Sequence, residues 1–129
     1  MSAELSLLTW SVVLMFAQML VAAMGANLQV GLSTLAGNRE DMPALTGWAG
    51  RARRAHLNML ENLVLFAALV LVAHAAGKTS DTTVLGAQLF FWGRVVHAGS
   101  YIAGIPYVRT LGFFAGYVGM AMIFISIVR

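Results

Sequence analysis

The sequence contains no cysteine, which excludes disulfide bonds and thiolate metal ligands. Any thiol chemistry would need a thiol supplied by a bound ligand. Charged residues are also scarce, at 10% of the 129 residues, whereas hydrophobic residues make up 60%. This composition is typical of a membrane protein and not of a soluble domain. No basic stripe interleaved with aromatic residues is present, so the net charge of +3 does not indicate nucleic-acid binding.

The chain has room for four membrane crossings, because each helical crossing needs about 20 mainly apolar residues. The expected fold class is therefore an all-α membrane protein, with a four-transmembrane-helix bundle in a single domain over residues 1–129. The expected spans are Leu5 to about Val30, Arg51 to Gly77, Thr83 to Gly104, and Thr110 to Val128. The first span follows an acidic start and is too long for the apolar core of a signal peptide, so we expect a retained helix.

The stretches between the spans carry the signals of loops and turns. Residues 35–50 combine Gly, Pro, Asn and charged residues, which predicts a loop on the membrane surface. Residues 78–83 predict a short turn in which Asp81 or Thr82 caps the next helix. Residues 105–107, I-P-Y, break the helix, since the residue before a proline disfavours the α conformation. The last span contains Gly112, Gly116 and Gly119, which would let another helix approach closely.

A polar stripe begins the second span. In a helix Arg51, Arg54, Asn58 and Glu61 share one face, because they are three, four and three residues apart. Glu61 lies deep in an apolar segment, where an ionisable residue is costly and marks a candidate functional site. Arg53 lies off the stripe and is expected to sit beside anionic lipid headgroups and to help set the topology. The same interpretation stays open for Arg51 and Arg54.

A second stripe, formed by Arg94, His97 and Tyr101, lies on one face of the third span. Arg94 is as deep as Glu61, so we expect the two to neutralise each other as an ion pair between neighbouring helices. That pair could be purely structural. His97 either hydrogen-bonds a ligand or packs as an ordinary interior histidine.

No metal site is expected. His56 and His74 lie too far apart along one helix to share an ion, and no H-E-x-x-H motif is present. Both are interpreted as interfacial residues.

Arg109 follows the proline turn and opens the last span. The start of a helix favours an anion, through its free N–H groups and the positive end of its macrodipole. A guanidinium there would stabilise a thiolate, the nucleophilic form of a thiol, and Thr110 could add a hydroxyl donor. The alternative is an interfacial arginine that helps to set the topology.

The basic residues are divided unevenly between the two ends of the spans. One side holds Arg39, Arg51, Arg53, Arg54 and Arg109, and the other holds Lys78 and Arg129. By the positive-inside rule, the arginine-rich loops face the cytoplasm and both termini lie outside it.

The runs R-A-H-L-N-M-L-E at 54–61 and G-R-V-V-H-A-G-S-Y at 93–101 resemble the MAPEG family, the membrane-associated proteins of eicosanoid and glutathione metabolism. The resemblance covers most of the chain and is closest to the bacterial branch. It includes the arginine that opens the last span. Leu57 stands where some members carry a second arginine, and Phe113 stands where one branch has a tyrosine.

This resemblance implies a homotrimer of four-helix bundles in a bacterial inner membrane, with glutathione bound between subunits near the cytoplasmic face. The residues assigned to glutathione binding are Arg51, Arg54, Asn58, Glu61, His97 and Tyr101. Glu61 would suit the ammonium group of the tripeptide, and Arg54 and Asn58 its carboxylate and amide groups. Arg109 matches the arginine that activates the thiol, and Thr110 stands where some members have a serine.

The leading hypothesis is a membrane-bound, glutathione-dependent transferase or peroxidase acting on hydrophobic electrophiles that enter from the bilayer. One alternative is a small proton-coupled transporter or lipid-binding protein, in which Glu61 and Arg94 form a relay. Another is a non-catalytic membrane scaffold whose stripes bury ion pairs between subunits. The expected partners are further copies of the chain, membrane lipids and a hydrophobic small molecule, but no nucleic acid.

Overall fold

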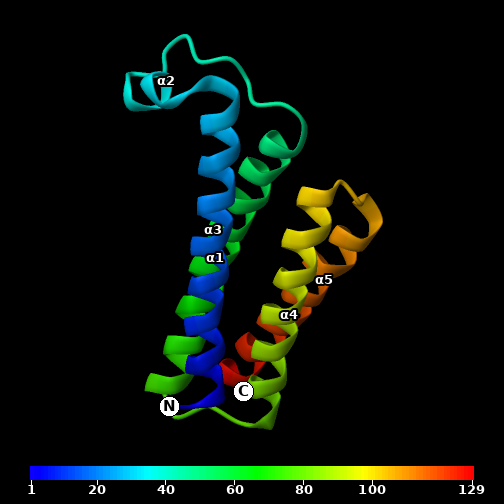
Figure 1. Cartoon of the computed structure of the whole chain (residues 1–129). Coiled ribbons are helices and arrows are strands. Elements are labelled where there is room, and N and C mark those ends of the chain that lie inside the picture. Colours follow the sequence, from blue (N-terminus) through cyan, green and yellow to red (C-terminus); the bar gives the residue numbers. More distant parts are fainter.

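A computed structural model describes residues 1–129 as an all-helical protein (Figure 1). Its helices are α1 (Ala3–Val30), α2 (Leu32–Ala36), α3 (Gly47–Ala75), α4 (Asp81–Ala103) and α5 (Pro106–Val128). The all-α prediction is confirmed. The expected count of four helices is incomplete, because the short helix α2 adds a fifth. Helix α3 also begins earlier than expected, so Trp48 belongs to its first turn and not to the loop.

Local sequence sets the ends of α4 and α5. Ser80 caps α4, and the expectation of Asp81 or Thr82 was wrong. The reason is a capping box: the Ser80 hydroxyl accepts from the Thr83 N–H, and the Thr83 hydroxyl accepts from the Ser80 N–H. Pro106 is the first residue of α5, a position where its missing N–H leaves no hydrogen bond unmade. Arg109 therefore lies in the first turn of α5.

Helices α4 and α5 form a close hairpin built on glycine. A Cβ atom on Gly112 would lie 2.5 Å from the carbonyl oxygen of Gly93. A Cβ atom on Gly119 would overlap the carbonyl oxygen of Gly86. The predicted close approach to the glycines of the last span is confirmed, and the helix that approaches is α4.

The long helices are arranged as two pairs, α1 with α3 and α4 with α5. The pairs meet at the end that holds both termini and the turn at 76–80, and their ribbons diverge toward the other end (Figure 1). We call these the closed end and the open end. The open end holds the loop at 37–46 and the α4–α5 turn at 104–105. Toward the closed end, Phe66 of α3 stacks on Phe90 of α4, with ring centroids 3.9 Å apart.

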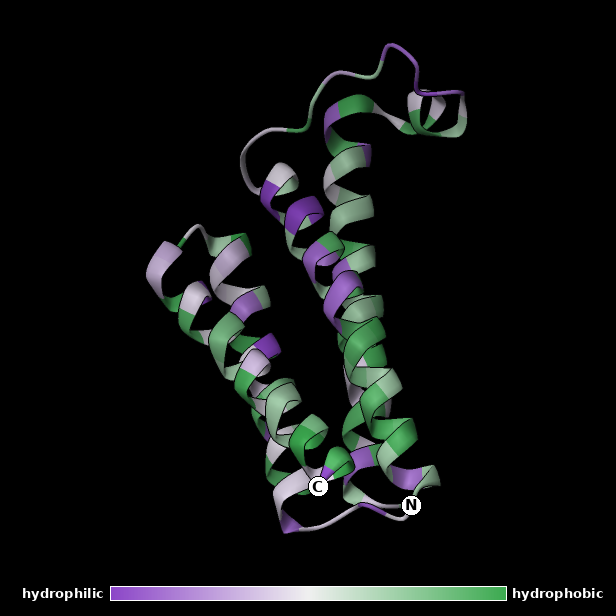
Figure 2. Ribbon diagram, turned by 180° about the vertical axis from the view of Figure 1, so that it is seen from behind, coloured by the Kyte–Doolittle hydropathy of each residue, from purple (hydrophilic) through white to green (hydrophobic).

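Helices α1, α3 and α5 are each long and apolar enough to cross a membrane. Helix α4 has 23 residues but is not among them. It carries Gln88, Arg94 and His97, whose polar side chains lower its hydropathy. A membrane crossing by α4 therefore stays a prediction. The hydrophilic residues gather in the loop at 37–46 and along the adjoining turns of α3 (Figure 2).

Candidate functional site

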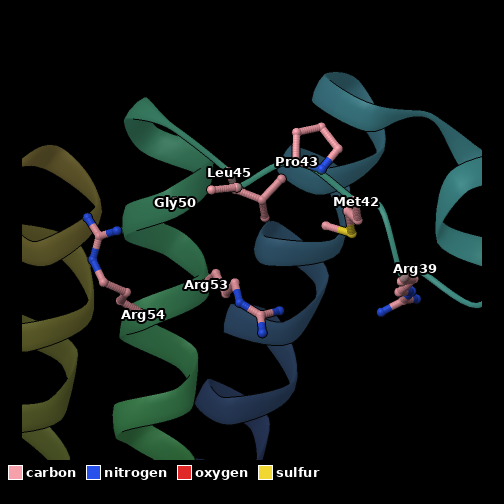
Figure 3. A pocket seen from close by; sticks show the side chains of 8 residues that line it. Arg39, Met42, Pro43, Leu45, Gly50, Arg53 and Arg54 are labelled. Atoms are coloured by element: carbon pink, nitrogen blue, oxygen red, sulfur yellow. The ribbon is translucent and has the colours of Figure 1, made fainter.

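The arginines at the start of α3 point to different sides of the helix. Arg54 points toward α4, whereas Arg53 points toward α1 (Figure 3). A pocket of about 440 Å³ under the loop is lined by Arg39, Arg53 and Arg54. The sequence placed Arg53 off the polar stripe, and the structure agrees with that placement.

Side chains from three helices meet at Tyr101, near the end of α4. Arg54 of α3 donates a hydrogen bond from Nε to the Tyr101 hydroxyl at 3.3 Å. Arg109 of α5 lies over the ring of Tyr101, with its guanidinium carbon 4.5 Å from the ring centroid. The fold thus brings together Arg54, Tyr101 and Arg109, which the sequence assigned to one site. Two cations meet at one aromatic ring, an arrangement that favours an anionic ligand.

Arg51 is engaged with the backbone of the chain. Its Nε donates to the carbonyl oxygen of Ile102 at 2.9 Å, so it links the first turns of α3 to the end of α4. Its side chain is half-buried. The structure therefore places Arg51 at the open end with Arg54, as the stripe predicted, but bonded to protein.

Arg94 is buried between the helix pairs and donates from Nη2 to the Asn58 side-chain oxygen at 2.7 Å. The expected Glu61–Arg94 ion pair is not formed within this chain, and Glu61 is exposed. Asn58 lies one turn before Glu61 on the same face of α3, at the level that the Arg94 head reaches. The predicted contact between the two polar stripes is present, but its α3 member is an amide and not a carboxylate.

His97 is 3% exposed and packs among aromatic rings. Its ring centroid lies 5.3 Å from that of Tyr101 and 6.2 Å from that of Phe113. Its Nδ1 atom is buried and has no hydrogen-bond partner within the chain. His97 therefore packs in the interior and also keeps one ring nitrogen free beside Tyr101.

Thr110 is exposed at the start of α5, and its hydroxyl donates to the carbonyl oxygen of Pro106 at 3.1 Å. The hydroxyl proton is thus used within the helix, while the oxygen can still accept a hydrogen bond. No group of three or more His, Asp or Glu side chains lies close enough to hold a metal ion.

Two contributors to the site were not identified from the sequence. Asn62 is buried and donates from Nδ2 to the Asn58 backbone carbonyl oxygen at 2.9 Å and to the Asn58 side-chain oxygen, the acceptor of Arg94, at 3.4 Å. Its four-residue spacing from Asn58 was a usable signal. The carbonyl of Ile102, the acceptor for Arg51, is a backbone group and has no side-chain signal.

Comparison with known sequences decides the family. The MAPEG family profile matches residues 7–129. The chain belongs to the MAPEG family. Together with the three apolar helices, this membership makes the protein an integral membrane protein.

Several relatives of this MAPEG chain are mammalian. Microsomal glutathione S-transferase 1 is 40% identical over 68 residues in Homo sapiens, 41% in Bos taurus and 38% in Rattus norvegicus. The match covers 52% of this chain and 44% of each relative, so it spans less than half the length of those proteins. No solved structure matches the chain.

Proposed function

We propose that the protein is a membrane-bound, glutathione-dependent transferase or peroxidase that acts on hydrophobic electrophiles. The observation that carries the proposal is the convergence of Arg54 and Arg109 on Tyr101. The glutathione S-transferases that match half of the chain support the choice of ligand. A transferase that joins a polar tripeptide to an apolar acceptor needs a cationic site that borders the lipid, and the open end of this protein fits that need.

Glutathione carries two carboxylates, an ammonium group and a thiol, and the residues from the open end to the middle of α3 offer a group for each. Arg54 and Asn58 suit carboxylate and amide groups, because a guanidinium and an amide both donate hydrogen bonds to oxygen. Glu61 is exposed on the same face of α3 and suits the ammonium group. His97 and Tyr101 line the site, and the free Nδ1 of His97 gives it a further polar contact.

Arg109 is the residue proposed to stabilise the thiolate. It lies in the first turn of α5, so the guanidinium and the positive end of the helix dipole both favour a negative sulfur there. Thr110 is the next residue, and its hydroxyl oxygen can accept a hydrogen bond from an N–H group of the ligand. In the transferase reaction the sulfur lone pair forms a bond to the electrophilic carbon, and the leaving group departs with its electron pair.

An apolar groove between α3 and α5 suits the hydrophobic acceptor. It has a volume of about 430 Å³ and is lined by Leu65, Ala68, Leu69, Tyr117, Met120, Ala121 and Phe124. Tyr117 packs on Phe113 with ring centroids 4.3 Å apart, and Phe113 in turn borders His97. Aromatic contacts therefore connect the groove, which lies toward the closed end, to His97 at the border of the proposed glutathione site.

The proposal includes a homotrimer, supported by the position of Glu61. A carboxylate within a membrane span faces protein or water and not lipid, because its charge is costly in hydrocarbon. Glu61 has no partner within the chain and lies among the exposed apolar side chains of Leu57, Leu60, Val64 and Leu65. A neighbouring subunit would cover this face and complete the site.

The proposed orientation places the open end in the cytoplasm and both termini outside it, in a bacterial inner membrane. The open end carries the arginines of the loop, of α3 and of the start of α5, whereas Lys78 and Arg129 lie at the closed end (Figure 1). This division is the one that the positive-inside rule favours.

The first prediction tests Arg109. Arg109→Ala is expected to reduce conjugation of a hydrophobic electrophile by at least about 100-fold, the usual effect of losing a group that stabilises developing or stored charge. Calorimetry on the detergent-purified protein would measure glutathione binding, and ultraviolet absorbance would measure the thiolate. Arg129→Ala is the matched control, since it removes an exposed arginine at the closed end. A full thiolate signal in Arg109→Ala would overturn the assigned role, and no glutathione binding by the unaltered protein would overturn the proposed function.

A further inference from the structure

The end of α4 leaves the carbonyls of Ile102 and Ala103 without a backbone donor. The last carbonyls of a helix have no partner within it. Here the Ile105 N–H bonds the Ser100 carbonyl oxygen at 2.8 Å, and the Gly104 N–H bonds that of Tyr101 at 3.1 Å. Gly104 has φ 82, the left-handed conformation that this type of helix end requires. The next carbonyl is that of Ile102, and Arg51 supplies its donor from α3.

Arg51 also packs against the turn that follows. A Cβ atom on Gly104 would lie 3.4 Å from the Arg51 Nε and 3.5 Å from its Cζ. The guanidinium therefore lies beside the α4–α5 turn, within van der Waals distance of the space that a Cβ atom on Gly104 would occupy. The hydrogen bond and this packing together fix the distance between the start of α3 and the turn.

That distance matters because Arg54 of the proposed site lies on α3, whereas Tyr101 and Arg109 lie beside the α4–α5 turn. Tyr101 immediately precedes Ile102, and Arg109 lies in the first turn of α5, just after the turn at 104–105. Arg54 reaches Tyr101 from α3 across the same gap between the diverging helix pairs (Figure 1). Without a second link at this end, the Arg54–Tyr101 contact alone would hold the two halves of the site together.

We propose that Arg51 is a positioning residue, which clasps the end of α4 to α3 and so holds Tyr101 and Arg109 in place opposite Arg54. The inference rests on the proposed function for the ligand, and it replaces a direct contact of Arg51 with glutathione. Arg51 acts through the carbonyl of Ile102 and the turn at Gly104.

The link between Arg51 and the end of α4 is tested on the ligand-free protein. In Arg51→Leu, hydrogen exchange at the Gly104 and Ile105 amides is expected to accelerate by roughly tenfold or more, because the helix end opens more often. Arg39→Leu is the matched control: its Nε also bonds a carbonyl oxygen, that of Leu35 at 2.8 Å, but within its own segment. Unchanged exchange in Arg51→Leu would overturn the proposal, whatever the fate of glutathione binding.

The positioning role is separated from direct binding by comparing affinity with the state of the bound thiol. Arg51→Leu is expected to weaken glutathione binding by roughly tenfold, because the ligand must first restore the arrangement that the Arg51–Ile102 hydrogen bond holds in the unaltered protein. At saturating glutathione it is also expected to lower the thiolate absorbance per bound ligand, because Arg109 is displaced. An unchanged thiolate signal at saturation would make Arg51 a ligand contact and overturn the proposal. If the unaltered protein binds no glutathione, the proposed function fails. The exchange measurement would still show whether Arg51 holds the end of α4.

Discussion

At the scale of single residues, Arg94 is the least exposed charged side chain of the protein, at 1%. The aliphatic part of its side chain passes over Gly116. A Cβ atom on Gly116 would lie 3.6 Å from the Arg94 Cδ. Its head has one hydrogen bond, to the Asn58 side-chain oxygen, and its Nε has none. A buried cation depends strongly on each acceptor it retains, because water cannot replace a lost one.

The second prediction concerns this acceptor. Asn58→Leu is expected to lower the free energy of unfolding by about 1–3 kcal/mol, because the buried guanidinium loses its partner. Asn58→Asp keeps an acceptor at the same position and should be the more stable of the two variants. Chemical denaturation of the detergent-solubilised protein without glutathione would measure both. Equal stability of Asn58→Leu and the unaltered protein would show that Arg94 does not depend on Asn58.

Residue spacing predicted which side chains share a face, but not which of them touch. Helical periodicity places Asn58 and Glu61 on the same side of α3 and Arg94 on the facing side of α4. The choice between the two partners depends on the relative height at which α3 and α4 pack. That height is set by the fold, through contacts such as the Phe66–Phe90 stack, and it selected Asn58.

At the scale of helices, the α4–α5 hairpin depends on glycines that meet in pairs. Gly86 faces Gly119 and Gly93 faces Gly112, so backbone contacts backbone along the hairpin. The close approach increases van der Waals contact between the helices, which is the main attraction available to helices in lipid. The backbone of α4 at His97 is part of this close approach. A Cβ atom on Gly112 would lie only 2.9 Å from the His97 backbone nitrogen.

The third prediction compares two glycines of this hairpin. Gly112→Ala is expected to destabilise the protein by about 1–3 kcal/mol, because the added methyl group must push α4 away from α5. Gly99→Ala is the control: no atom lies within 4 Å of its added Cβ, so it should gain up to about 1 kcal/mol from helix propensity. Thermal unfolding in detergent would rank the variants. Similar shifts for both would contradict the assigned packing.

At the scale of the whole molecule, polar contacts join the two helix pairs at both ends. At the closed end, Thr83 of α4 donates from its hydroxyl to the Glu4 carboxylate of α1 at 2.7 Å, and both side chains are buried. Glu4 also lies in the first turn of α1 and beside the first turn of α4, where two helix dipoles favour its negative charge. At the open end the links come from Arg51 and Arg54. The proposed site thus lies where the pairs diverge most.

The fourth prediction tests the closed end. Thr83→Val has nearly the same shape as threonine but leaves the buried Glu4 carboxylate without a donor and the Ser80 N–H without its acceptor, so it should lose about 1–3 kcal/mol of stability. Thr83→Ser keeps the hydroxyl and loses only one methyl group, and it should lose less. Hydrogen exchange in the first turns of α1 would show whether the loss is local. A Thr83→Val variant as stable as the unaltered protein would exclude a role for this contact.

The sequence by itself determined the membrane class, the positions of the long helices and the grouping of polar residues into two stripes. These properties depend on local composition and helical periodicity, which involve residues near one another in the chain. Only the tertiary structure decided that Asn58 and not Glu61 meets Arg94, that Arg51 bonds the carbonyl of Ile102, and that Arg54 and Arg109 share Tyr101. These contacts depend on how far the helices slide and tilt against one another, and that geometry is set by the sum of all their packing contacts.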